Sequence, residues 1–352
     1  MKRSGRMILI FSCLTLMLLG FSTASLSAEH AVVLQYHHFG DNTPPSTSVT
    51  LEQFDRHLEY LSENEYNVWP LEKIVVYLKE KKELPDRCVA ITMDDAYVSV
   101  YEEAYPRLKS YGFPFTVFVP TEGVEKGIKS YLTWEQMKEM KRAGAVFASH
   151  SHSHDYLIRR NPGETEDAWI NKVINDIGKS LDLLKEKLGS VSKLFVYPYG
   201  EYNIAFKQII RSLGLTGFGQ QSGAAWQGSD FAVLPRFPMA AHYAEMDEFI
   251  VKVRSMPLPV ISVEPADPVL PHDVSEPVLR LTLAPGEYLP DSLTCYSGGQ
   301  GRINVRWLDR DEGIVEITPN KELSKGRSRY NCTARHKNEN RFFWHSHLWI
   351  KE

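Results

Sequence analysis

The sequence lacks the features of several protein classes. Its formal net charge is −4, so the basic surplus typical of a nucleic-acid-binding protein is missing. No internal repeat and no low-complexity tract is visible. Hydrophobic residues make up 43% and charged residues 24% of the chain, which is an ordinary globular composition and not that of a disordered protein. We therefore expect a folded protein that does not bind nucleic acid.

Long apolar runs are also scarce, and the exception lies at the N-terminus. A basic start, residues 2–6, precedes an apolar run over residues 7–21, and small residues follow up to Ala28. This order is typical of a signal peptide, and the run is shorter than the about 20 apolar residues that span a membrane. We predict a signal peptide over residues 1–28 and an exported, periplasmic or extracellular protein with no transmembrane helix in its mature form. An uncleaved anchor is the alternative.

Cysteine is rare, with four residues in the chain. Cys13 lies in the N-terminal apolar run, and Cys88 lies in a strand-like run typical of a protein core. Cys295 and Cys332 both lie in the C-terminal part, and an exported protein meets an oxidising compartment. We expect a disulfide between these two cysteines, with two buried free thiols as the alternative.

The 352 residues favour one large domain and one small domain. Residues 29–256 alternate strand-like and helix-like segments, which predicts parallel strands in a barrel or an open α/β sheet. Thr133 and Gln136 have the spacing of a capping box and predict a helix start. Residues 257–278 form a proline-rich, linker-like stretch. Short β-type runs over residues 279–352 predict a small all-β domain that resembles a sandwich.

Potentially reactive side chains gather where the predicted parallel strands end. The carboxyl ends of such strands lie on one face of a sheet, where active sites are built. Four strands contribute to this group, which consists of His37 and His38, Asp94 and Asp95, His150, His152 and His154, and residues 197–200.

These residue types suit a catalytic metal site. A catalytic zinc takes three protein ligands and leaves one position open, and His150 and His154 with one aspartate supply such a set. Asp94 and Asp95 are neighbours, so their side chains cannot point the same way on a regular strand. One of them can bind the metal while the other accepts a proton from the attacking water.

Three segments resemble the motifs of the polysaccharide deacetylases, carbohydrate esterase family 4 with its NodB-homology domain. Residues 92–95 have the order Thr-Met-Asp-Asp, similar to the family's Thr-Phe-Asp-Asp. Residues 150–154 match its His-Ser/Thr-x-Ser-His motif, and residues 195–200 resemble its third motif. The resemblance covers roughly residues 31–256.

The resemblance implies a distorted (β/α) barrel with one divalent metal, usually zinc. It implies that Asp94 is the catalytic base and that Asp95, His150 and His154 are the metal ligands. His152 stands at the variable position of its motif and is left out of the metal shell. The backbone N–H of Tyr199 would contact the oxyanion that forms on the acetyl carbonyl.

Some positions depart from the family pattern. Ala96 replaces the usual glycine, a mild change if its φ is negative. Val196 stands where many members carry an arginine that orients the base, and Arg236 is a candidate for that role. The late Leu-x-His motif is missing, and the surroundings of His242 do not match it.

A subgroup of the family accounts for this gap. Exported deacetylases of poly-β-1,6-N-acetylglucosamine, a biofilm polymer, are similar to the N-terminal part of this chain. They carry Tyr-His at the end of the first strand, as Tyr36 and His37 do here. The likeness implies that His37 is the general acid, although His37 or His38 can instead only line the pocket.

The resulting hypothesis is a metal-dependent hydrolase that removes N-acetyl groups from such a polymer. Deacetylation of peptidoglycan or chito-oligosaccharides is one alternative, and an inactive glycan-binding relative is another. The C-terminal β domain can bind glycan, contact an envelope partner or cap the barrel. Four aromatic residues are candidates for stacking on sugar rings, with packing in the core as the alternative: Tyr97, Trp134, Tyr202 and Trp226. Trp226 is favoured because we expect residues 220–229 to cross the active face.

Overall fold

The structure, a computed structural model, describes residues 27–41 and 43–352. The predicted signal peptide lies outside the described residues, apart from Ser27 and Ala28, which form the short strand β1. β1 pairs with β6 (Leu84–Pro85). Among the described residues, no helix is both long enough and apolar enough to cross a membrane.

Four of the α-helices described below, α1, α5, α6 and α7, begin at a residue whose side chain caps the helix. Thr133 Oγ1 accepts a hydrogen bond from Gln136 N at 3.2 Å, and Thr133 N donates to Gln136 Oε1 at 2.8 Å, which confirms the predicted capping box. Thr50 caps the first helix in the same way with Gln53. The α-helices are α1 (Leu51–Glu63), α2 (Leu71–Lys79), α3 (Tyr105–Tyr111), α4 (Thr121–Glu125), α5 (Trp134–Arg142), α6 (Glu166–Leu188), α7 (Ile204–Ser212) and α8 (Met246–Val253).

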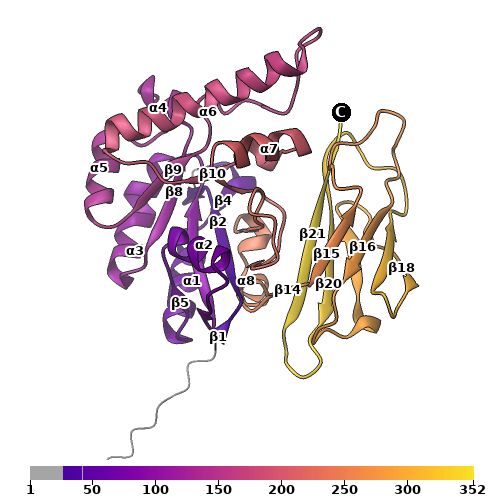
Figure 1. Cartoon of the computed structure of the whole chain (residues 1–352). Coiled ribbons are helices and arrows are strands. Elements are labelled where there is room, and N and C mark those ends of the chain that lie inside the picture. The colour runs from indigo at the N-terminus through magenta and orange to yellow at the C-terminus, as the bar shows by residue number, and fades with distance from the viewer. Residues whose placement is uncertain (1–26, 42) are drawn as a thin grey trace, which may run out of the picture.

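A curled sheet forms the centre of the N-terminal part (Figure 1). Its main strands pair in parallel and follow one another in chain order, as expected when a helix crosses from each strand to the next. They are β2 (His30–Tyr36), β7 (Cys88–Met93), β8 (Phe115–Val119), β9 (Val146–Ser149), β10 (Leu194–Val196) and β11 (Thr216–Phe218).

One later segment connects the two ends of this curl. Leu234 forms a parallel bridge with Phe218 of β11. A few residues on, β13 (Phe237–Pro238) pairs in parallel with Leu34 and Gln35 of β2. The sheet thus has the curled, barrel-like form of the predicted fold class, and Arg236 lies in the segment that joins its last strand to its first.

Both faces of the sheet are buried, which explains its nearly continuous apolar strands. In β2, Val32 and Leu34 belong to the hydrophobic cluster beneath α1 and α3, whereas Ala31 and Val33 belong to a cluster shared with α2. The same alternation runs along β7, where Ala90 lies in the second cluster. The alternation holds up to Met93, where β7 ends, and Asp95 beyond it has φ 69° and no longer follows the strand.

The C-terminal part is a second sheet that stands beside α7 and α8 (Figure 1). Its strands pair mainly in antiparallel fashion and form one continuous sheet. In spatial order they are β14 (Met256–Pro257), β21 (Phe342–Lys351), β20 (Gly326–Arg335), β17 (Thr294–Ser297), β18 (Gly301–Asp309), β19 (Ile314–Thr318), β16 (Leu279–Leu283) and β15 (Val260–Glu264).

The structure differs here from the predicted organisation in two ways. The strands curl as one eight-stranded sheet, whereas a sandwich would need two packed sheets. The stretch 257–278, expected to be a linker, contains β15, which pairs with β16 and extends the sheet. The prediction of a linker was wrong because the prolines flank this edge strand and do not interrupt it. The proposed domain boundary at residue 256 falls inside β14.

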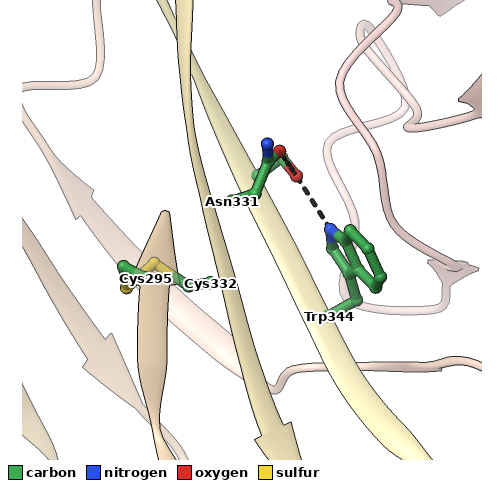
Figure 2. Close-up of a disulfide and its surroundings, with 5 residues drawn as sticks. Cys295, Asn331, Cys332 and Trp344 are labelled. Atoms are coloured by element: carbon green, nitrogen blue, oxygen red, sulfur yellow. Dashed lines mark hydrogen bonds between the residues drawn. A yellow bond between two sulfur atoms is a disulfide. The ribbon is translucent and has the colours of Figure 1, made fainter. Parts of the chain in front are cut away.

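A disulfide joins Cys295 of β17 to Cys332 of β20 (Figure 2), as expected from the sequence. The two residues are direct cross-strand neighbours and lie in the core of the C-terminal sheet. The chain between them spans 37 positions, and closing such a loop stabilises a fold by about 4 kcal/mol in the chain-entropy model. Cys88 is free and buried.

Side chains on the opposite face of the C-terminal sheet dock the two parts together. Trp344 Nε1 donates to Ser346 Oγ at 3.0 Å, and Ser346 Oγ donates to Asn331 Oδ1 at 2.6 Å (Figure 2). The Trp344 indole packs edge-on against Phe237 of β13, with ring centroids 5.2 Å apart. Farther along β21, Leu348 and Ile350 belong to the cluster formed by α6 and α7. The two parts therefore share an apolar interface.

His57 of α1 is a buried hydrogen-bonding group in the large domain. Its Nε2 lies 2.8 Å from the carbonyl oxygen of Ala244, its Nδ1 lies 3.0 Å from the Tyr36 hydroxyl, and its ring stacks on Phe249. Burial lowers the pKa of His57 from 6.5 to about 4, although the Ala244 carbonyl opposes this and the charge of Lys252 adds to it. The fold therefore requires the neutral imidazole.

We predict that His57 makes the fold sensitive to acid. Its contribution is complete above the unfolded pKa of 6.5 and is lost as the pH falls towards about 4, which corresponds to about 3 kcal/mol. Urea unfolding at about pH 7 and about pH 4.5 should therefore show a smaller loss of stability in His57→Gln than in the unmodified chain. His272→Gln, at an exposed site, should behave like the unmodified chain. An equal acid loss in all three proteins would contradict the prediction.

Candidate active site

The sheet brings the predicted reactive residues together at the carboxyl ends of its parallel strands. Asp94 and Asp95 follow β7, and His150 and His154 follow β9. The end of β10 lies beside them, because the Nδ1 atom of His150 is 2.9 Å from the carbonyl oxygen of Val196. Segments far apart in the sequence therefore meet at one edge of the sheet.

Asp95, His150 and His154 form a group that can hold a metal ion. Asp95 Oδ1 lies 3.3 Å from His150 Nε2 and 3.2 Å from His154 Nε2, and the two Nε2 atoms are 3.2 Å apart. In a tetrahedral zinc site with ligands about 2.0–2.1 Å from the ion, ligand atoms lie about 3.3–3.4 Å from one another. The spacing of the three atoms is thus that of a divalent metal site.

The protonation of these groups also fits a cation. His150 Nδ1 faces a carbonyl oxygen, to which it can only donate, and this leaves Nε2 directed at Asp95 as the atom that can bind a metal. Asp95 Oδ1 is buried and has no hydrogen-bond partner among the described residues. A carboxylate oxygen and an imidazole lone pair that converge in this way repel each other unless a positive charge lies between them.

A residue of α6 holds the loop after β9. Asp176 accepts hydrogen bonds from the backbone N–H groups of His152 and Ser153, at 2.8 Å and 3.0 Å. Ser151 Oγ accepts another from His154 N at 2.9 Å. These bonds turn the His152 side chain away from the ligand group and towards α4, where its Nδ1 lies 2.9 Å from Thr121 Oγ1. His152 accordingly lies outside the group of three ligands.

Asp94 is fully buried and has partners of its own. Arg236 contacts both of its carboxylate oxygens, each at 2.7 Å, and Gln35 Nε2 donates to Oδ2 at 2.7 Å. Burial by itself would raise the pKa of Asp94, but the charge and hydrogen bonds of Arg236 outweigh this effect and hold the pKa below its usual value. Asp94 is therefore ionised at neutral pH.

Arg236 itself is fixed on all sides and fully buried. Its Nε donates to the carbonyl oxygen of Gly219 at 3.0 Å, its Nη1 donates to Thr92 Oγ1 at 3.1 Å, and its guanidinium lies 5.5 Å from the Phe118 ring centroid. The arginine that is missing at Val196 thus has a counterpart from the segment that closes the sheet.

The two histidines after β2 have different surroundings. His37 Nε2 lies 3.9 Å from Asp94 Oδ2, so this imidazole borders the aspartate at the site. His38 stacks on Tyr97, with ring centroids 3.6 Å apart, and Tyr97 stacks in turn on Tyr131. His38 is therefore part of an aromatic stack beside the site.

The third motif forms a tight turn next to the ligand group. Tyr199 has a left-handed backbone, with φ 58° and ψ 5°, and its ring lies 4.8 Å from that of His154. The ring of Tyr156 stacks on Tyr199 at 4.0 Å. The turn thus lies against the histidine loop, and Tyr156 is an exposed aromatic side chain that the sequence analysis did not select.

The structure does not support several other expectations from the sequence. Ala96 has φ 52°, so the condition under which its replacement of glycine would be mild is not met, and a left-handed alanine costs about 1–2 kcal/mol. Trp226 pairs with His30 at the amino end of β2, so the expected path of its loop over the active face is wrong. Tyr202 is buried in the core, and Trp134 packs against another cluster.

Two further residues were not found from the sequence. Gln35 is the second-last residue of β2, and its contact with Asp94 depends on the pairing of β2 with β7. Asp176 lies in the middle of α6, where an acidic residue usually faces the solvent. No local signal distinguishes either residue, because their partners lie 59 and 24 positions away.

A model of the polysaccharide deacetylase family matches residues 81–218. The chain is 30% identical over 194 residues to the poly-β-1,6-N-acetyl-D-glucosamine N-deacetylase of Staphylococcus aureus (strain MRSA252), which covers 54% of this chain and 67% of that protein. The chain belongs to the polysaccharide deacetylase family. This membership agrees with the expected fold and with the ligand group at the strand ends.

Other relatives cover the chain only in part. The Bacillus subtilis (strain 168) protein YxkH is 29% identical over 186 residues, which are 53% of this chain and 61% of YxkH. The chain therefore spans about three fifths of the length of that relative.

Two solved structures resemble the chain with 26% sequence identity. The Streptococcus pyogenes deacetylase PplD, in complex with acetate, has a TM-score of 0.57 and covers 64% of this chain and 98% of its own. IcaB from Ammonifex degensii has a TM-score of 0.56 and covers 64% and 97%. Each likeness takes in nearly all of the other protein and leaves part of this chain unmatched.

We predict that this family member binds one Zn²⁺ ion through the three ligands. Asp95→Asn removes the carboxylate charge and should weaken Zn²⁺ binding at least about 100-fold, measured by calorimetric titration of the chelator-treated protein. Asp155→Asn is the matched control, because Asp155 is exposed and next to His154. Equal affinity in Asp95→Asn and the control would contradict the assignment of Asp95 as a ligand.

We also predict that the Asp94–Arg236 pair is a strong determinant of stability. Arg236→Met leaves a buried, unpaired carboxylate and should lower the free energy of unfolding by about 3–5 kcal/mol. Combining it with Asp94→Asn should cost less than the sum of the two single changes. Arg211→Met breaks the more exposed pair with Asp230 and should cost under about 1 kcal/mol. Additive losses in urea unfolding would argue against a direct coupling of Asp94 and Arg236.

Proposed function

We propose that the chain is a metal-dependent hydrolase that removes N-acetyl groups from N-acetylglucosamine residues of an extracellular or envelope polysaccharide. The observation that carries this proposal is the pairing of two aspartates with separate surroundings. Asp95 converges with two histidines in a ligand group, while Asp94 is held as an anion by Arg236. Hydrolysis of an amide needs both an electrophilic centre and a base.

A divalent metal bound by Asp95, His150 and His154 would polarise the acetyl carbonyl and lower the pKa of the attacking water. Zn²⁺ suits this set of one carboxylate and two imidazoles. The protein supplies the remaining groups from its own strand ends.

Asp94 is proposed as the general base. An ionised carboxylate has about four lone-pair sites, and Arg236 and Gln35 occupy three of them. The remaining acceptor site can take the proton of the water as its oxygen bonds to the acetyl carbon. Arg236 acts here as an orienting group, because its two hydrogen bonds fix the plane of the carboxylate.

His37 is proposed as the general acid. When the carbon–nitrogen bond breaks, the leaving amine needs a proton, and His37 borders the same site as the base. A histidine in this position typically accelerates such a step about 10²–10⁴-fold. The N–H of Tyr199 is proposed to donate to the oxyanion on the acetyl carbon. The products are then acetate and the free amino sugar.

For the substrate we propose poly-β-1,6-N-acetylglucosamine. The support is the relative from Staphylococcus aureus that carries this activity in its name, together with the histidine at the end of β2. Peptidoglycan and chito-oligosaccharides are the alternative substrates. An inactive glycan-binding relative is the alternative outside enzymes, but such a protein has no need of an arginine-held carboxylate beside a metal-ligand group.

We further propose that the protein acts outside the cytoplasm. The disulfide between Cys295 and Cys332 suits an oxidising compartment, and the basic and apolar N-terminal residues suit export. A periplasmic or extracellular location agrees with a polysaccharide substrate. We propose that the C-terminal sheet contacts an envelope partner.

Acetate release from poly-β-1,6-N-acetylglucosamine tests this proposal directly. The full chain should release acetate, lose this activity with a chelator and regain it with Zn²⁺. His37→Gln should lower kcat about 10²–10⁴-fold, while His38→Gln, the neighbouring control, should lower it less than about tenfold because its ring stacks beside the site. Asp94→Asn should abolish turnover while leaving Zn²⁺ bound.

Two results would contradict the proposal in different ways. A folded, Zn²⁺-loaded chain that releases no acetate from this polymer, from chito-oligosaccharides or from peptidoglycan would favour a glycan-binding relative. Equal losses in His37→Gln and His38→Gln would leave hydrolysis intact but remove His37 as the specific acid.

A further inference from the structure

A residue of the C-terminal sheet reaches the active-site turn. Arg327, near the start of β20, donates a hydrogen bond from Nη1 to the carbonyl oxygen of Tyr199. Its guanidinium carbon also lies 5.7 Å from the centroid of the Tyr199 ring. The two residues are separated by 128 positions in the chain, so this contact exists only because the C-terminal sheet docks beside α7.

A buried acidic residue strengthens this contact. Glu201, two positions after Tyr199, is 3% exposed, and its Oε2 has no hydrogen-bond partner among the described residues. Its Oε1 lies 3.7 Å from Arg327 Nε and 3.6 Å from Arg159 Nη2. A buried carboxylate requires nearby positive charge, and these two guanidinium groups supply it.

Aromatic and cation contacts also hold the ring of Tyr199. The guanidinium of Arg159 lies 3.9 Å from the centroid of the Tyr156 ring, and Tyr156 stacks on Tyr199 at 4.0 Å. Tyr199 is thus held on one side by Tyr156 and on its carbonyl side by Arg327. Tyr156 belongs to the deacetylase part of the chain, whereas Arg327 belongs to the C-terminal sheet.

The backbone of Tyr199 needs such support. Its left-handed conformation, with φ 58°, costs a residue other than glycine about 1–2 kcal/mol. Gly200 N donates to Tyr197 O at 2.8 Å and Glu201 N donates to Pro198 O at 3.1 Å, but neither bond fixes the Tyr199 carbonyl. Because the N–H and the carbonyl belong to one residue with two soft torsions, holding the carbonyl limits the directions that the N–H can take.

We propose that Arg327 is a positioning residue that holds Tyr199 so that its N–H points at the reacting acetyl group. This inference rests on the proposed function, in which that N–H donates to the oxyanion. It assigns the C-terminal sheet a part in catalysis, because the sheet completes the turn that the deacetylase part leaves open. Arg327 itself contacts neither the substrate nor the metal ligands in this scheme.

Kinetics of arginine variants in the full chain test the proposal. Arg327→Met keeps the aliphatic stem and loses the donor, and it should lower kcat about tenfold or more with KM changed less than about threefold, because a misplaced oxyanion donor weakens mainly the transition state. Arg327→Lys keeps a donor and should recover part of the loss. Arg335→Met, at an exposed site near the other end of β20, is the matched control and should retain the kcat of the unmodified chain.

A measurement that needs no turnover separates this proposal from the proposed function. Hydrogen exchange of the peptide over residues 197–203 should be at least about fivefold faster in Arg327→Met than in Arg335→Met. Unchanged exchange, an unchanged kcat or a rise in KM alone would each overturn the positioning role. If the unmodified chain releases no acetate, the proposed function fails, and the exchange result alone decides whether Arg327 holds Tyr199.

Discussion

The buried contact between Asp94 and Arg236 is the interaction on which the rest of the site depends. It requires β7 to end beside β2, and it requires the segment before β13 to cross between β11 and β2. Only a closed curl brings a guanidinium from position 236 onto a carboxylate at position 94. The contact also gives two adjacent aspartates different partners, since Arg236 binds Asp94 whereas Asp95 converges with His150 and His154. Fold closure and the division of chemical roles are therefore consequences of the same geometry.

Much of this site could be predicted from the sequence because its chemistry lies in local motifs. Asp95, His150 and His154 each follow an apolar strand, and parallel strands must present such positions on one edge. The partners that tune these groups could not be predicted in the same way. Gln35 and Asp176 depend on pairings between distant segments, and their residue types are common on any surface. Arg236 was a candidate because Val196 lacks the family's arginine, and its contact with Asp94 also depends on such a pairing. Trp226 shows the reverse error, since a loop assigned to the active face from its polarity pairs with the amino end of β2.

The arrangement of the strands in the C-terminal part could not be predicted from local composition. Its β character followed from short runs of β-branched and aromatic residues, and the cysteine pair indicated which two strands lie together. The prolines between residues 257 and 278 suggested a linker, yet β15 adds a strand at the edge of the sheet. The prolines lie before and after this strand, so its pairing with β16 is not interrupted. The choice between a sandwich and one curled sheet depends on strand order, which is a long-range property that no local pattern specifies.

Backbone strain at the site has the same long-range origin. Five residues of the site have positive φ angles: Asp95, Ala96, Ser151, His154 and Tyr199. This conformation costs free energy in a residue other than glycine, and contacts with other segments must offset that cost. The loop after β9 is held by Asp176 from α6, and the turn after β10 is held by Arg327 from the C-terminal sheet. Strained turns allow several functional groups to converge on one small volume, which regular strand ends would keep apart. The helix and the second sheet are therefore needed to keep the strand ends in a conformation that the motifs alone would not maintain.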